Sequence, residues 1–298
     1  MFALTLTLKV QVRLGEWDEA KKTLEVVRSN KLPELHYLTG FYRWKKRQFD
    51  RAVSEFRTAL RLGYDQVEVY HGLATCLFRL DNLPEAEKAI AAGMERRRPN
   101  VLLLDLAAQI AIARQRYDDA EQYIDQLRRM RADADYHHRL AILLNARKRF
   151  NEALPHAEQA RQGGRRRFEV EATLIDTLIE VRRLPAAAEL LDELDKHDGN
   201  YNRDVRLGLR CKLLIREGKW QEAERIWNQL EEKFRPVHVA LRAEILAQEI
   251  SDPSVGPGKR AEANAELDGI KATLGWTQAL VFLADDDGGD GPDESDEL

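Results

Sequence analysis

The sequence predicts an all-α fold: a right-handed helix–turn–helix solenoid of about seven to eight repeats. The main observation is a four-residue phrase that ends in alanine and recurs along the chain. Its alanines are separated by 32, 34, 34, 33, 34 and 36 residues, at Ala20, Ala52, Ala86, Ala120, Ala153, Ala187 and Ala223. A fixed period near 34 residues is typical of stacked helical hairpins, which bury their apolar faces only against one another.

The chemistry of the phrase supports a helix start in each repeat. A large apolar residue is followed by a residue such as Asp18, Pro84 or Asn151. Asp and Asn cap free N–H groups, and Pro is tolerated in the first turn. The alanine allows close approach of a neighbouring helix. Four residues later the same helix face is mostly apolar, with Leu24, Phe56, Ile90, Ile124, Ala157, Leu191 and Trp227.

The phrase divides residues 1–283 into an array of repeats, each with a first and a second helix. The repeats lie near 2–32, 34–64, 68–98, 101–131, 134–164, 168–198 and 203–234, and a degenerate repeat covers 236–276. After a first helix that starts near Phe2, the expected helix pairs are 34–46 with 49–62, 68–80 with 84–97, 101–114 with 118–130, 134–147 with 151–162, 168–182 with 185–196, 203–216 with 221–234, and 236–250 with 259–274.

Residues 284–298 form an acidic tail. Eight carboxylates, with Gly and Pro, lie between Asp285 and Leu298, so this segment cannot bury apolar surface and we expect it to be disordered. Since the whole chain carries −4, residues 1–284 carry about −4 + 8 = +4. The two cysteines, Cys76 and Cys211, fall on expected first helices and are interpreted as reduced packing thiols.

The third repeat resembles the tetratricopeptide repeat (TPR) family, and the resemblance extends over about residues 2–276. The residues that carry it are Tyr70, Ala74, Leu83-Pro84-Glu85-Ala86, Ile90 and Pro99. The resemblance implies a non-enzymatic adaptor that binds a protein or peptide in a concave groove lined by the first helices. It specifies the fold closely and the partner hardly at all.

The resemblance also implies which side chains line that groove. Transferred to this sequence, they are Tyr37, Phe41, Trp44, His71, Thr75, Phe78, Arg79, Asp105, Gln109, His138, Asn145, Asp176, Lys212 and Arg216. Tyr37, Phe41, Trp44 and Phe78 would form one aromatic patch of the kind that dominates binding energies. In the alternative interpretation, Trp44 and Phe78 pack between adjacent first helices.

The sequence gives little support to nucleotide-binding, metal-binding or enzymatic functions. Gly256-Pro257-Gly258-Lys259-Arg260 lacks the first Gly and the final Ser or Thr of a phosphate-binding loop. His137 and His138 are adjacent, so on a helix they point about 100° apart and cannot clamp one metal ion. No catalytic pair can be named, and we expect no enzyme activity and no cofactor. The sequence predicts no membrane-spanning segment, and the expected location is the cytoplasm.

Two alternative functions remain open. The first helix begins without a cap at Phe2, which is compatible with a sensor or regulatory region of a larger multidomain protein, such as a bacterial signalling or defence ATPase. Basic clusters such as 45–47, 96–98, 128–131, 147–149 and 165–167 recur with the repeat and could form a rim for an anionic polymer such as a nucleic acid. Cations at helix C-termini also stabilise the helix dipole, which gives these clusters a purely structural explanation.

Overall fold

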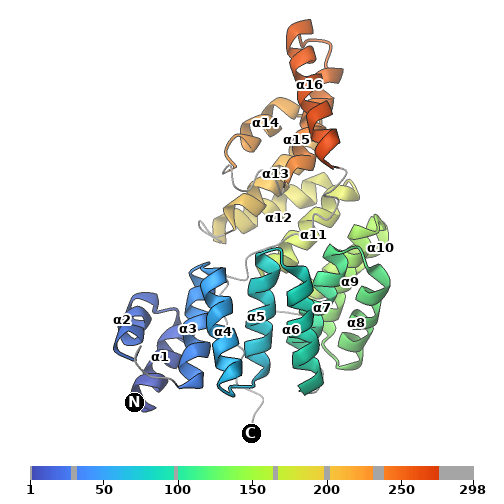
Figure 1. Cartoon of the computed structure of the whole chain (residues 1–298). Coiled ribbons are helices and arrows are strands. Elements are labelled where there is room, and N and C mark those ends of the chain that lie inside the picture. The colour runs from blue at the N-terminus through green and yellow to red at the C-terminus, as the bar shows by residue number, and fades with distance from the viewer. Residues whose placement is uncertain are drawn as a thin grey trace. The chain divides into compact units, whose positions relative to one another are not determined.

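The computed structural model describes residues 2–27, 32–96, 100–163, 167–197, 202–230 and 238–274, and within these ranges it is helical, without strands (Figure 1). The helices are α1 (Phe2–Leu14), α2 (Trp17–Val27), α3 (Pro33–Lys45), α4 (Phe49–Arg61), α5 (Val67–Arg79), α6 (Leu83–Arg96), α7 (Val101–Ala113), α8 (Tyr117–Arg129), α9 (Asp133–Ala146), α10 (Phe150–Gln162), α11 (Phe168–Glu180), α12 (Leu184–His197), α13 (Arg203–Arg216), α14 (Trp220–Trp227), α15 (Val239–Ser251) and α16 (Pro257–Leu274).

The chain forms two compact units. The N-terminal unit contains residues 1–111 and 122–131, and the C-terminal unit contains residues 112–121 and the described part of 132–285. Each unit is built from helical hairpins, in which odd-numbered helices are first helices and even-numbered helices are second helices. The predicted all-α helical repeat fold is confirmed.

The periodic alanines explain how the hairpins close. All seven are completely buried, from Ala20 to Ala223. A methyl side chain at this position lets the two helices of a hairpin approach, and the larger apolar residue four positions later fills the space beside them. Of those residues, Phe56 and Leu191 are fully buried and Trp227 retains 7% exposure.

The seven hairpin turns from α1–α2 to α13–α14 each use a left-handed residue. At the end of α3, the Arg47 amide donates to the Trp44 carbonyl (2.8 Å) and the Gln48 amide donates to the Arg43 carbonyl (2.9 Å). This is the Schellman pattern, which satisfies the last carbonyls of a helix and requires positive φ at one residue. The equivalent residues are Gly15, Arg47, Asp81, Gln115, Lys148, Arg182 and Gly218, with φ between 57° and 76°.

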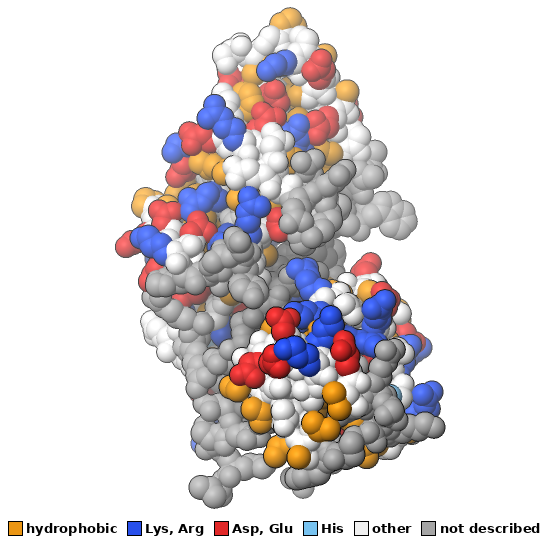
Figure 2. All heavy atoms as spheres, turned by 90° about the vertical axis from the view of Figure 1, so that its left-hand side faces the viewer, with side chains coloured by type: hydrophobic (Ala, Val, Ile, Leu, Met, Phe, Trp, Pro, Cys, Tyr) orange, Lys and Arg blue, Asp and Glu red, His pale blue; other side chains and the backbone are white. Residues whose placement is uncertain are grey.

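Apolar side chains from successive repeats make up the core of each unit. In the N-terminal unit, Leu8 and Val12 of α1 pack with Leu35 and Leu38 of α3. In the C-terminal unit, one cluster joins α11, α12 and α13 through Ile175, Ile179, Leu191, Leu209 and Leu213. Figure 2 shows the side on which α1 and α2 lie, where some hydrophobic side chains remain at the surface.

Both cysteines lie inside the core. Cys76 and Cys211 are free thiols with no exposed surface. Burial raises the pKa of each thiol to about 12, so both stay protonated at neutral pH. They therefore act as small packing residues.

The last two repeats differ in their boundaries from the sequence expectation. The second helix α14 ends at Trp227, and α15 begins at Val239 after residues 231–237, which lie outside the described ranges. The apolar segment 276–283 and the acidic tail 284–298 also lie outside them. Among the helices that the structure describes, none is long and apolar enough to cross a bilayer.

Candidate partner-binding surface

Five ring side chains form a continuous row on the N-terminal unit, here called the aromatic row. Tyr64 stacks on Tyr37 with a centroid separation of 5.5 Å, and Tyr37 lies 6.4 Å from Phe41. Phe41 meets Trp44 edge to face at 5.2 Å, and Trp44 meets His71 of α5 at 6.4 Å. Offset and edge-to-face geometries at these separations are favourable. All five residues are half-buried, so part of each ring remains accessible.

The helix spacing creates this row. Tyr37, Phe41 and Trp44 occupy positions i, i+4 and i+7 of α3, which lie along one face. Phe56 of α4 supports Tyr37 from inside the unit, with their ring centroids 6.2 Å apart. The Lys45 ammonium nitrogen lies 5.0 Å from the Trp44 ring centroid and 5.7 Å from that of Phe41. This cation therefore lies within cation–π distance of both rings.

The other expected groove residues of the N-terminal unit lie at different depths. Phe78 is only 6% exposed and Thr75 only 9%, so both lie inside the packed layer and offer a partner little surface. The Thr75 hydroxyl has no hydrogen-bond partner. For Phe78 the alternative of packing between first helices fits its burial, because it has no room to project outward. Arg79 on α5 and Asp105 and Gln109 on α7 are half-buried.

In the C-terminal unit, polar side chains link four successive first helices, and we call this set the polar row. Nε2 of His138 lies 3.1 Å from the Thr173 hydroxyl, and the Asn145 amide donates to the Thr177 hydroxyl (2.8 Å). Lys212 of α13 pairs with Asp176 and Glu180 of α11. The row then continues from Arg216 to Glu180 and Glu244, and ends where the Gln248 amide donates to the Ile215 carbonyl.

The charges of the polar row largely neutralise one another. Burial acts to lower the pKa of Lys212, but the carboxylates of Asp176 and Glu180 outweigh it and raise that pKa. Burial acts to raise the pKa of Glu180, and the opposite charges of Lys212 and Arg216 lower it instead. Lys212 and Glu180 are therefore both ionised at neutral pH. Because each charge already has a partner, this row joins adjacent repeats and offers few unpaired groups to a ligand.

The structure thus gathers the expected residues into two separate sets. Tyr37, Phe41, Trp44 and His71 belong to the aromatic row, whereas the polar row contains His138, Asn145, Asp176, Lys212 and Arg216. Sequence reasoning missed Tyr64, Thr173, Thr177, Glu180 and Glu244. Tyr64 precedes α5 in a loop without helical periodicity. Thr173, Thr177 and Glu180 follow the repeat, and aligning the first helices on the periodic alanine would have placed them beside their partners. Glu244 lies on α15, after the last periodic alanine, so this alignment gives no signal for it.

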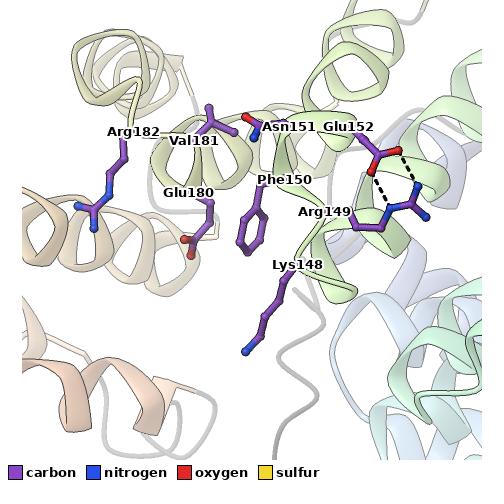
Figure 3. Close-up of a pocket in the computed structure, with 8 residues that line it drawn as sticks. All are labelled: Lys148, Arg149, Phe150, Asn151, Glu152, Glu180, Val181 and Arg182. Atoms are coloured by element: carbon purple, nitrogen blue, oxygen red, sulfur yellow. Dashed lines mark hydrogen bonds and ion pairs between the residues drawn. The ribbon is translucent and has the colours of Figure 1, made fainter.

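A shallow cavity of about 340 Å³ lies at the turn between α9 and α10 and the end of α11. In Figure 3, Phe150 lies between Glu180 on one side and the Arg149–Glu152 pair on the other. The Arg149 guanidinium forms two hydrogen bonds, of 2.7 and 2.6 Å, to the Glu152 carboxylate. None of the expected groove residues lines this cavity, and its charged groups are mixed in sign.

In the parts of the chain that the structure describes, no group of three or more His, Cys, Asp or Glu side chains is placed to hold a metal ion. His137 does contact a second histidine, His156 of α10, across 2.9 Å between their Nδ1 atoms. The two imidazoles stack with a centroid separation of 5.1 Å.

The comparisons with known proteins agree with this architecture. The sequence model of the tetratricopeptide repeat family matches residues 37–101, which include the entire aromatic row. No curated protein matches the chain in sequence.

Solved structures share its fold at low sequence identity. A tetratricopeptide repeat protein from Parabacteroides merdae is 15% identical, with a TM-score of 0.62, over 80% of this chain and 97% of its own. PilF of Pseudomonas aeruginosa is 17% identical, with a TM-score of 0.51, over 66% of this chain and 92% of its own. The Cut9–Hcn1 hetero-tetramer of the APC/C contains a chain that is 12% identical, with a TM-score of 0.62, over 91% of this chain and 49% of its own.

Proposed function

Because the chain belongs to the tetratricopeptide-repeat proteins, we propose that it is a non-enzymatic scaffold that binds a protein or peptide segment on the first-helix face of its N-terminal unit. Proteins of this fold are in general interaction scaffolds. The Cut9–Hcn1 hetero-tetramer, in which a similar chain assembles with another protein, supports such a role. The proposed contact surface is the aromatic row.

The observation that carries the proposal is the half-buried state of these rings. Tyr37, Phe41 and Trp44 are held by neighbouring rings and by a rigid helix, yet they keep accessible surface. Rigid aromatic side chains lose little conformational entropy when a partner covers them, so they are common binding hot spots. The polar row lacks this character because its charges are already paired.

The chemistry of the row defines the partner. A peptide with an apolar or aromatic side chain would pack on Phe41 and Trp44. An acidic residue beside it would meet the Lys45 ammonium, which lies over both rings. We therefore propose that the ligand is a short segment with an apolar or aromatic anchor and an adjacent carboxylate.

Selection from a random peptide display library tests this proposal without a known partner. The full chain should enrich peptides with an aromatic or large apolar anchor next to Asp or Glu. The Trp44→Ala variant should bind the enriched peptides about 30-fold more weakly, which corresponds to about 2 kcal/mol for a hot-spot ring. Leu62→Ala is a matched control, because Leu62 is 41% exposed and lies outside the row.

The expected outcome is loss of binding in Trp44→Ala with unchanged helicity and unchanged binding in Leu62→Ala. Equal affinity of wild type and Trp44→Ala for the enriched peptides would contradict the assignment of this surface. If Trp44→Ala loses helicity, the Trp44→Phe variant is measured instead. This variant keeps an aromatic ring and should retain most of the affinity.

The basic rim is the less favoured alternative, because many of its cations are already paired. Arg147 contacts Asp118 and Glu121, Arg149 contacts Glu152, and Arg128 contacts Asp125. If the rim bound a nucleic acid, affinity would fall steeply with salt concentration. Peptide binding on aromatic rings should depend on salt far less.

A further inference from the structure

Two carboxylates lie beside the aromatic row where it begins at Tyr64. Glu34 stands three residues before Tyr37 on α3. Glu68 stands three residues before His71 on α5. Because residues three apart lie on the same face of a helix, both carboxylates lie on the face that carries the row. Burial raises the pKa of the Tyr64 hydroxyl and the charges of Glu34 and Glu68 raise it further, so both carboxylates lie near that ring.

Neither of these carboxylates is neutralised by a neighbouring side chain. Within the described ranges of the chain, no ion pair joins Glu34 or Glu68 to a cation. Glu34 is half-buried and Glu68 is exposed, so both can contact a ligand that lies on the row. The stacked rings of Tyr37 and Tyr64 lie beside them. Aromatic faces next to carboxylates suit a guanidinium group, which stacks on a ring and donates hydrogen bonds to carboxylate oxygens.

Positive charge lies at the other end of α3. Lys45, the last residue of α3, places its ammonium over the rings of Trp44 and Phe41. It follows Glu34 by 11 residues, which separates their backbone positions by about 16 Å along the helix axis. This separation exceeds the Debye length of about 8 Å at physiological ionic strength, so the two charges hardly neutralise each other. The row is therefore acidic around Tyr64 and basic around Trp44.

This charge pattern is confined to the two repeats that carry the row. Glu68 and Arg79 of the third repeat occupy the positions of Glu34 and Lys45 in the second, 18 and 7 residues before the periodic alanine. In the other repeats with a periodic alanine, the residues at these two positions are Phe2 and Arg13, Leu102 and Ala113, Asp135 and Ala146, Glu169 and Glu180, and Val205 and Arg216. Compensation of helix dipoles would serve every repeat, so it does not explain this restriction.

We propose that the aromatic row selects an extended segment of a partner protein in which an arginine stands about five residues from an acidic residue, with the apolar anchor between them. The arginine lies against Tyr64 beside Glu34 and Glu68, and the acidic residue lies at Lys45. An extended chain rises about 3.3 Å per residue, so about five residues span the distance between the two charged ends. This inference rests on the proposed function, because it assigns the charge pattern of a ligand bound to the same surface.

Peptide display tests the acidic end of the row separately from its rings. The full-length wild type and the variant Glu34→Lys/Glu68→Lys each select from the same random peptide library. Peptides enriched by the wild type should contain Arg about five residues from Asp or Glu. Peptides enriched by the variant should keep the apolar anchor and lose the Arg, which would meet two ammonium groups. Replacing the Arg of an enriched peptide by Gln should weaken its binding to the wild type about fivefold, as expected for two exposed ion pairs.

Asp18→Lys/Asp50→Lys is the matched control. These exposed residues lie in the first turns of α2 and α4, so the change in charge and the cost at the helix N-termini are the same. This control should enrich the same peptides as the wild type. If Glu34→Lys/Glu68→Lys loses helicity, Glu34→Gln/Glu68→Gln is used instead and should also enrich fewer peptides with Arg.

Two results would overturn the inference and leave the proposed function intact. One is enrichment by the wild type of anchored acidic peptides without Arg, and the other is undiminished enrichment of Arg by Glu34→Lys/Glu68→Lys. Enriched peptides that bind equally well to Trp44→Ala would overturn the inference and the proposed function together, because the aromatic row would then not be the contact surface.

Discussion

The ammonium nitrogen of Lys212 on α13 lies 2.7 Å from a carboxylate oxygen of Glu180 on α11. The same ammonium contacts Asp176, and Glu180 also contacts Arg216. These side chains retain only 11–18% of their exposure. Three adjacent first helices are thus joined by paired charges, since Arg216 reaches Glu244 of α15, which is 39% exposed. The mutual pairing explains why ionised groups are tolerated there.

Removing the central cation should destabilise the C-terminal unit. In Lys212→Met, the carboxylates of Asp176 and Glu180 lose their common partner while they stay shielded from water. A broken buried pair costs about 3 kcal/mol in the free energy of unfolding. Urea denaturation followed by circular dichroism measures this change.

The control for Lys212→Met is Arg149→Met, because the Arg149–Glu152 pair is solvent-exposed. Exposed pairs add little to stability, so the urea midpoint of this control should hardly move. The double variant Lys212→Met/Asp176→Leu should regain part of the lost stability. Equal midpoints for wild type and Lys212→Met would contradict a structural role for the polar row.

A second prediction concerns the contact of Gly72 with Phe56. In Gly72→Ala, the new Cβ would lie 2.7 Å from Cζ of Phe56, and the fully buried ring has little room to move. Overpacking of this kind costs about 1–3 kcal/mol. Gly269→Ala on α16 is the control, since nothing lies within 4 Å of its added Cβ, and it should gain stability from helix propensity. Equal free energies of unfolding for Gly72→Ala and Gly269→Ala would contradict the close packing of α5 on α4.

The left-handed turn residues offer a stabilising substitution. Gln115 has a φ of 57°, which is unfavourable for residues with a Cβ atom. Gln115→Gly should therefore raise the free energy of unfolding by about 0.5–1 kcal/mol. Gln122→Gly, near the middle of α8, should lower it by a similar amount. Thermal denaturation of both variants checks the opposite signs, and a loss of stability in Gln115→Gly would exclude the positive φ.

Stability should also decrease as the pH falls below neutral. Burial lowers the pKa of His137, His156 lowers it further, and Asp133 opposes both. Burial alone lowers the pKa of His156. Because the folded state holds these imidazoles neutral, the stability they provide is complete above their ordinary pKa of 6.5 and is lost as the pH falls through the lowered values. Each additional proton taken up on unfolding changes the free energy by at most about 1.4 kcal/mol per pH unit.

The double variant His137→Gln/His156→Gln isolates this effect. Its free energy of unfolding should change less between pH 7.5 and 5.5 than that of the wild type. A smaller dependence should remain, because burial also lowers the pKa of His238. Identical pH dependence in wild type and the double variant would show that the stacked pair is not responsible.

Much of the fold could be predicted because the repeat is a local pattern. The period of the alanines predicts the hairpins, and each of these residues is fully buried. Helix starts such as Leu83 and Leu184 lie within one or two residues of the expected positions, since Pro and acidic residues mark the first turn. The prediction was least accurate at the end of α14 and at α15, which follow the last copy of the phrase.

The binding surface was harder to predict. A helical register gives the direction of a side chain, but it does not show whether side chains of neighbouring helices bury it. Trp44 and Phe78 stand at the same repeat position, yet Trp44 is half-buried and Phe78 is only 6% exposed. The difference depends on the volumes of side chains on neighbouring helices. Tyr64 joins the aromatic row from a loop, for which periodicity provides no signal.

The sequence by itself therefore determined the helical repeat, the buried alanines and the packing role of the two cysteines, because these follow from local spacing and side-chain size. Only the tertiary structure decided which first-helix residues pair with one another. Lys212 meets Asp176 across 36 residues, and Leu6 lacks the cover that Leu38 receives. The pairing and the burial of these side chains depend on whether a neighbouring repeat fills the space beside their helix. The packing of one repeat on the next decides this, and local sequence spacing does not encode it.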